Sequence, residues 1–187
     1  IREIARSILV DHTFRFPMWD MSIGFGQDFQ DAFSFRPINF LFALVPESGI
    51  EVFLLIRVIF YLYLCGLCFS LLIRRFRWDG YAGLVGSMVY TFCGYSLYYA
   101  CRHTFFMELM CYLPLLFLGI EHILEKKKPW LFLAVVALCG MSSFTFLYMI
   151  ILPAVVYACI RYFHMDRQRN VRDFAGCFLY TALIFVW

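Results

Sequence analysis

Residues 50–73 read IEVFLLIRVIFYLYLCGLCFSLLI and are followed at once by Arg74-Arg75-Phe76-Arg77. As an α-helix, an apolar run of this length rises about 36 Å, enough to cross the ~30 Å hydrocarbon core of a bilayer. The stretch therefore predicts a membrane-spanning helix with a basic end. Short loops rich in Lys and Arg stay in the cytoplasm, so we expect the basic end there.

The composition extends this prediction to the whole chain. Of the 187 residues, 63% are hydrophobic and 16% are charged, and the mean hydropathy is +0.76. Soluble domains carry about 25% charged residues, so a soluble enzyme and a disordered chain are both excluded. The formal net charge of +3 comes from clusters at short loops, which indicates a lipid bilayer rather than nucleic acid as the partner.

Five further apolar stretches are predicted as membrane helices, at residues 80–99, 104–124, 130–142, 145–163 and 174–187. The run 129–163 is divided in two because a single helix of that length would rise about 52 Å. Basic clusters flank the run on both sides, so the chain has to cross twice, with a turn near Met141-Ser142-Ser143. The predicted fold class is an all-α, polytopic transmembrane bundle forming one domain over residues 1–187.

The first 48 residues are predicted to form an extracytoplasmic loop. Apolar residues recur at helical spacing at Ile1, Ile4, Ala5, Ile8 and Leu9, which indicates an amphipathic helix on the membrane surface. The ten apolar residues 37–46 are too short to span and predict an interfacial or re-entrant helix. The chain begins without an initiator Met and stops inside an apolar run, so we expect it to be an excerpt of a longer protein.

Several short sequences occur in an order and at spacings that resemble the YfhO family of bacterial membrane proteins. They are FPMWD at 16–20, GFGQDF at 24–29, RPINFL at 36–41, FCGYSLYY at 92–99, HTFFME at 103–108, LPLL at 113–116, GIE at 119–121 and SFTFLYM at 143–149. Three positions depart from the family pattern. Glu108 stands where Asn or Asp is usual, and Ser143 and Thr145 replace an Asn and a Tyr.

The resemblance implies a GT-C-like glycosyltransferase of the bacterial cytoplasmic membrane. Such an enzyme would move a sugar from a polyprenyl-phosphate donor to an extracytoplasmic cell-envelope acceptor, such as a teichoic or lipoteichoic acid. An inverting transfer needs a base for the acceptor hydroxyl and a positive group for the leaving phosphate. Arg, His or a divalent cation such as Mg²⁺ or Mn²⁺ can supply the second.

Asp28 is the leading candidate for the catalytic base or for a metal ligand. Gly24 and Gly26 permit tight backbone turns that can direct this carboxylate toward the membrane. The competing interpretation is an Asp that caps a turn in a glycine-rich loop. Asp20 and Asp31 are interpreted as solvated.

Two charged residues are predicted to lie inside membrane helices. Glu108 is one turn from the outer end of its helix, where an acid is costly and should face a cavity or a partner; we predict a catalytic role for it. Arg57 is seven residues inside its helix, too deep for easy snorkelling. It is predicted either to bind the donor phosphate or to pair with Glu108.

Four more residues complete the predicted substrate-binding set. Arg102 and His103 lie in the outer turn, where they can meet a phosphate or a lipid headgroup. The resemblance implies that Tyr95 and Tyr148 bind substrate. The alternative interpretation is that such tyrosines belong to the aromatic belt at the membrane interface. The rival function is a lipid-linked-sugar flippase or another transporter without catalysis. No internal repeat typical of transporters is evident.

Overall fold

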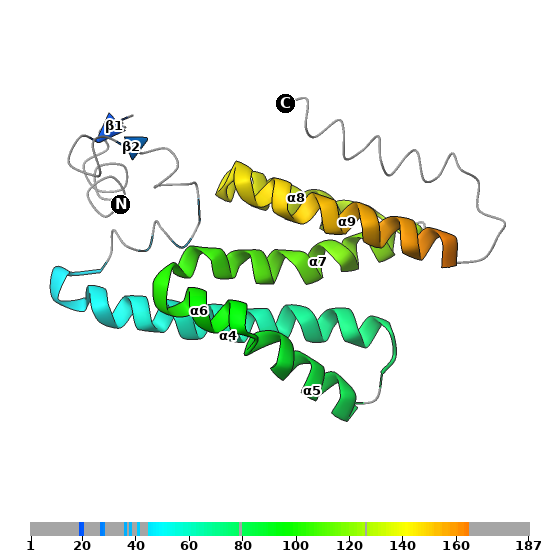
Figure 1. Cartoon of the computed structure of the whole chain (residues 1–187), viewed down its shortest axis with the longest axis horizontal. Helices are drawn as coiled ribbons and strands as arrows, with labels where there is room; N and C mark the ends of the chain where they lie inside the picture. Colours follow the sequence, from blue (N-terminus) through cyan, green and yellow to red (C-terminus); the bar gives the residue numbers. More distant parts are fainter. Residues whose placement is uncertain are drawn as a thin grey trace.

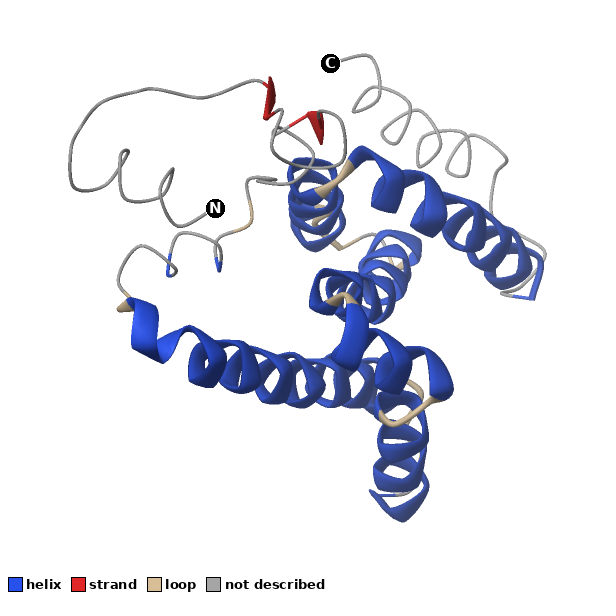
Figure 2. Cartoon of the chain, turned by 60° about the vertical axis from the view of Figure 1, so that its left-hand side comes forward, coloured by secondary structure: helices blue, strands red, loops and turns tan. Residues whose placement is uncertain are grey.

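The computed structural model describes residues 19–20, 27–28, 36, 38, 41, 45–78, 80–125 and 127–164. The predicted surface helix at residues 1–9 and the predicted span 174–187 lie outside these residues. The predicted interfacial helix 37–46 is described only at isolated positions. The described part is almost entirely helical, with short connections between the helices (Figure 2).

Six α-helices follow one another in the described part of the chain. They are α4 (Ile50–Arg75), α5 (Gly80–Thr91), α6 (Gly94–Arg102), α7 (Met107–Leu124), α8 (Trp130–Ser142) and α9 (Phe144–His164). Short 3-10 turns at Glu47–Gly49 and Thr104–Phe106 lead into α4 and α7. Strands β1 (Trp19–Asp20) and β2 (Gln27–Asp28) form one short antiparallel pair in which Trp19 lies opposite Asp28. The predicted all-α fold class is confirmed.

Helix α7 occupies the centre of the bundle. It packs against α4 on one side and against α8 and α9 on the other, while α5 lies on the far side of α4 (Figure 1). Half of the apolar span Thr104–Leu124 is buried inside the protein, against 22% of the spans in α4 and α9. The outer helices therefore leave large apolar side chains exposed, among them Leu55, Ile59 and Leu152, as expected for surfaces that face lipid.

The close approach of α7 to α8 depends on a glycine. A Cβ placed on Gly119 would lie 2.9 Å from the Cα of Phe132 and 3.0 Å from its backbone nitrogen. Gly119 therefore lets the two backbones touch, which is how many membrane helices pack. The core around this contact is apolar and includes Leu116, Ile120, Val136, Phe146 and Ile150.

Three helices are long and apolar enough to cross a membrane, within the described residues: α4, the segment Thr104–Leu124, and Thr145–Tyr162 in α9. Helix α8 has 13 residues and rises about 20 Å, less than the ~30 Å core. The apolar run 129–163 thus forms two helices that meet at Ser143, whose backbone is extended.

The predicted single helix at residues 80–99 is wrong, because the structure divides it into α5 and α6. Cys93 adopts an extended backbone conformation between them, and its thiol lies 3.5 Å from the hydroxyl of Ser96 in the first turn of α6. The Cys93 side chain makes no capping hydrogen bond to the backbone of α6, so this contact joins two side chains only. The predicted outer turn is also shorter than expected, since Cys101 and Arg102 belong to the last turn of α6.

Candidate functional site

A buried carboxylate marks the contact between α4 and α7. Glu108 lies in the first turn of α7 and is only 2% exposed. The hydroxyl of Tyr61, on α4, donates a hydrogen bond of 2.6 Å to Oε1 of Glu108. Charged hydrogen bonds of this length are among the strong ones in proteins, so this bond fixes the carboxylate against α4.

Two guanidinium groups converge on the same carboxylate. Nε of Arg36 lies 3.3 Å from Oε2 of Glu108, and Nη2 of Arg57 lies 3.8 Å from Oε1. Both arginines are 6% exposed. Arg57 and Tyr61 are four residues apart, so they project from one face of α4, and the guanidinium of Arg57 lies 5.6 Å from the ring centroid of Tyr61.

Arg36 connects this site to the end of α8. Its Nη2 donates a hydrogen bond of 3.4 Å to the backbone carbonyl of Ser142, and the Ser142 hydroxyl lies 3.1 Å from the hydroxyl of Tyr112. Aromatic rings flank the guanidinium, with centroids 4.9 Å away for Phe105 and 5.5 Å away for Phe146. Such rings attract a desolvated cation, so they help to hold the buried Arg36 side chain in place.

Two polar atoms of the cluster are buried without a hydrogen bond in the part of the chain that the structure describes. Nε of Arg36 and Oε2 of Glu108 are within ion-pair distance, yet neither atom has a hydrogen-bond partner among the described residues. Burial lowers the pKa of the Arg36 guanidinium, and the nearby Glu108 carboxylate opposes that shift. Arginine stays protonated in proteins.

This cluster does not fit a divalent cation. It offers one carboxylate, flanked by two positive groups that repel a metal ion. Groups of three or more His, Cys, Asp or Glu side chains placed for metal binding are absent from the described residues. A metal at Asp28 stays a prediction, because its side chain lies outside the described residues and only its backbone pairing in β2 is known.

A second buried carboxylate lies near the other end of α7. Glu121 accepts hydrogen bonds from both Nε and Nη2 of Arg161, at 2.5 and 2.8 Å, and from the hydroxyl of Tyr157 at 2.8 Å. The paired bonds match the planar fork of an arginine. Every oxygen of Glu121 is engaged by α9, so this group joins α7 to α9 and is a structural element.

The predicted site residues separate into two groups in the structure. Glu108 and Arg57 meet, which is one of the two alternatives predicted for Arg57. His103 contacts the edge of the site, because its ring packs on Phe105, which in turn lies against Arg36.

The other predicted residues lie away from Glu108. Arg102 and Tyr148 are exposed, and Tyr95 packs against Tyr99 within α6. None of these three has a described contact with the cluster of Arg36, Arg57, Tyr61 and Glu108, which we call the arginine–glutamate cluster. Their predicted roles in binding substrate stay predictions.

Sequence reasoning missed two members of the arginine–glutamate cluster, Arg36 and Tyr61. A signal existed for Tyr61, because a hydroxyl four residues after a buried arginine shares its helix face. Arg36 begins the RPINFL sequence, and its contact with Ser142 joins residues 106 positions apart. Nothing in local spacing indicates such a contact.

These features define an α-helical membrane protein that holds a charged cluster inside its bundle, where α7 begins. The sequence model of the family described as "Bacterial membrane protein YfhO" matches residues 4–186. The chain therefore belongs to this family of bacterial membrane proteins, as its short motifs indicated. Searches of curated proteins and of solved structures gave no significant match.

Proposed function

We propose that the chain forms the donor-binding part of a membrane glycosyltransferase with a GT-C-like fold. In this proposal the enzyme moves a sugar from a polyprenyl-phosphate donor to an extracytoplasmic cell-envelope acceptor such as teichoic acid. Membership of the family supports the proposal. The observation that carries it is the convergence of Arg36 and Arg57 on the buried carboxylate of Glu108.

The guanidiniums are proposed to bind the donor phosphate and to stabilise it as it leaves. The acceptor oxygen attacks the anomeric carbon, the bond from that carbon to the phosphate oxygen breaks, and the electron pair departs with polyprenyl phosphate. Fixed positive groups at the leaving oxygen act strongly where they are buried, and Arg36 and Arg57 are both 6% exposed. Arginine suits this task because its planar fork matches phosphate oxygens.

The proton of the acceptor hydroxyl must pass to a carboxylate. Both oxygens of Glu108 already face Tyr61 or an arginine, so we assign Glu108 to holding the two guanidiniums in place. Asp28 is then the proposed base. His103 is proposed to line the donor site through its contact with Phe105.

A flippase or other transporter is the second candidate. Charged groups buried in a membrane bundle also mark the substrate paths of transporters, so the arginine–glutamate cluster is compatible with lipid-linked sugar that binds without reacting. Glycosyl transfer needs a base for the acceptor hydroxyl, whereas transport does not.

The test is Asp28→Asn in the full-length protein, assayed for sugar transfer in proteoliposomes. Loss of an acid–base group costs about 10²–10⁴ in rate, whereas expression and membrane insertion should stay normal. Asp20→Asn is the matched control, because it removes an equal charge from the same segment and is expected to keep full activity. Normal transfer by Asp28→Asn would remove this residue from the mechanism. Absence of sugar transfer by the wild-type protein would favour the transporter.

A further inference from the structure

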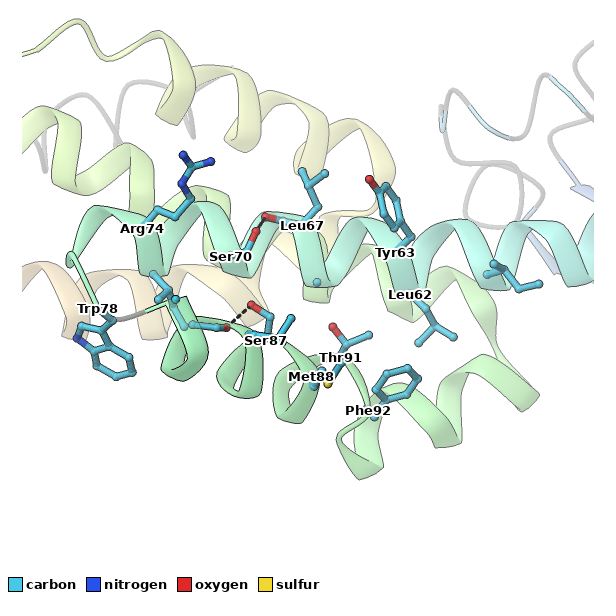
Figure 3. Close-up of a pocket in the computed structure, with 16 residues that line it drawn as sticks. Leu62, Tyr63, Leu67, Ser70, Arg74, Trp78, Ser87, Met88, Thr91 and Phe92 are labelled. Atoms are coloured by element: carbon cyan, nitrogen blue, oxygen red, sulfur yellow. Dashed lines mark hydrogen bonds between the residues drawn. The ribbon is translucent and has the colours of Figure 1, made fainter.

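A groove runs along the outside of the bundle between α4 and α5. Its volume is about 950 Å³, at the upper end of the range for small-molecule sites. Figure 3 shows Leu62 and Leu67 of α4 on one side and Met88 and Phe92 on the other. The groove lies on the opposite side of α4 from α7, so it is separate from the core.

The lining of the groove suits a hydrocarbon chain. Most of the side chains are aliphatic or aromatic. The two serines that line it are already satisfied, because Ser70 donates to the carbonyl of Leu67 and Ser87 donates to that of Gly83. The hydroxyl of Thr91, which also lines the groove, is buried and has no hydrogen-bond partner among the described residues. A polar ligand would gain few further hydrogen bonds from the lining side chains, whereas an apolar chain would lose little.

One end of the groove is different in character. Arg74 and Trp78 both line it and lie at the same end (Figure 3). Within the described residues Arg74 forms no ion pair, whereas its neighbour Arg75 is paired with Glu125. Trp is enriched at the membrane–water interface, so this end is at the level of lipid headgroups and carries an available positive charge.

The length of the groove matches one leaflet. Fifteen residues of α4 separate Ile59 from Arg74, which corresponds to about 22 Å along a helix. Half of a bilayer that includes its headgroups is also about 20–22 Å thick. A lipid with its headgroup at Arg74 would thus have its chain ends near Ile59, at the bilayer midplane.

We propose that the groove between α4 and α5 binds an anionic phospholipid of the leaflet in which Arg74 lies. The acyl chains occupy the groove, and the phosphate contacts the guanidinium of Arg74. Basic pockets between membrane helices bind anionic headgroups in this way.

This lipid site is separate from the proposed donor site. Arg57 of the arginine–glutamate cluster lies seventeen residues before Arg74 on α4, about 26 Å away along the helix. The headgroup end of the groove is therefore well separated from the arginine–glutamate cluster, and the lipid site does not depend on the proposed glycosyltransferase activity.

Photo-crosslinking of the full-length protein in nanodiscs tests the lipid site. The probes are phosphatidylglycerol and phosphatidylcholine that carry the same diazirine-labelled acyl chain, and mass spectrometry locates the crosslinked residues. We expect crosslinks on groove residues such as Leu62 and Met88, with phosphatidylglycerol about five-fold more efficient, the preference that one surface arginine gives.

Arg74→Gln should abolish that preference, and Arg77→Gln is the matched control. Arg77 is exposed at the same end of α4 and does not line the groove, so its loss should leave the five-fold ratio unchanged. Equal crosslinking by the two lipids in the wild-type protein would overturn the proposal. So would crosslinks that avoid the groove, or a preference that survives Arg74→Gln.

Discussion

Replacing Glu108 with Gln would leave two buried guanidiniums without their carboxylate. At an effective dielectric constant of 20, the attractions across 3.3 and 3.8 Å are about 5 and about 4 kcal/mol. Desolvation of the three ions offsets much of this. Loss of one partner of a buried ion pair typically costs about 3–5 kcal/mol, and we expect Glu108→Gln to lower the free energy of unfolding by this amount.

Unfolding in SDS, followed by thiol labelling, measures this change in the full-length protein. Cys65 and Cys111 are buried free thiols that meet at 3.3 Å beside the arginine–glutamate cluster, and they become reactive only when α4 and α7 separate. Tyr61→Phe is the control, because it removes the 2.6 Å hydrogen bond and keeps all charges, at a cost of about 1.5–3 kcal/mol.

A double mutant separates charge from packing. Arg36→Gln together with Glu108→Gln restores the net charge of the cluster, so the two changes should cost clearly less than their sum. If Glu108→Gln instead costs under about 0.5 kcal/mol, the carboxylate is not paired with charged arginines, and the electrostatic reasoning is wrong.

Three further predictions concern packing and topology. Gly119→Ala should destabilise the protein by about 1–3 kcal/mol through overpacking. Gly140→Ala is the control and should be neutral or stabilising, because a Cβ there would lie 3.8 Å from the nearest atom, in Leu147. Equal unfolding free energies of the two variants would contradict this prediction. Arg161→Lys should lower the free energy of unfolding by about 1–2 kcal/mol in the same assay, because one ammonium cannot replace the two hydrogen bonds to Glu121. An unchanged free energy of unfolding would show that this ion pair does not stabilise the fold. Cys101, which is exposed, should react with an impermeant thiol reagent on intact cells when all other cysteines are replaced, and labelling only after permeabilisation would reverse the proposed orientation.

The sequence was most informative where burial of charge is costly. The depth of Arg57 and Glu108 within apolar helices predicted that each needs a partner, and in the structure they lie 3.8 Å apart. The basic clusters on both sides of the run 129–163 also predicted two helices there, and the structure has α8 and α9. In both cases the cost of placing charge in hydrocarbon is large and can be read locally.

Other features were not accessible from the sequence because their signals are long-range or weak. Arg36 reaches Glu108 and Ser142 only through the folded path of the chain. The break between α5 and α6 falls inside a stretch that length alone predicts as one span. Apolar character drops from α5 to α6, and Gly94 indicates a boundary. Likewise, the groove on α4 depends on how α5 crosses it.

Sugar transfer by the purified full-length protein tests the central claim most directly. The assay would use liposomes that contain polyprenyl-phosphate-linked sugar on the side of the arginine–glutamate cluster, together with a teichoic acid acceptor. We predict transfer by the wild-type protein and a loss of about 10²–10³ in rate for Arg36→Lys, which keeps the charge but not the forked geometry. If the wild-type protein carries the donor across the bilayer without forming a new glycosidic bond, the proposed glycosyltransferase activity is contradicted.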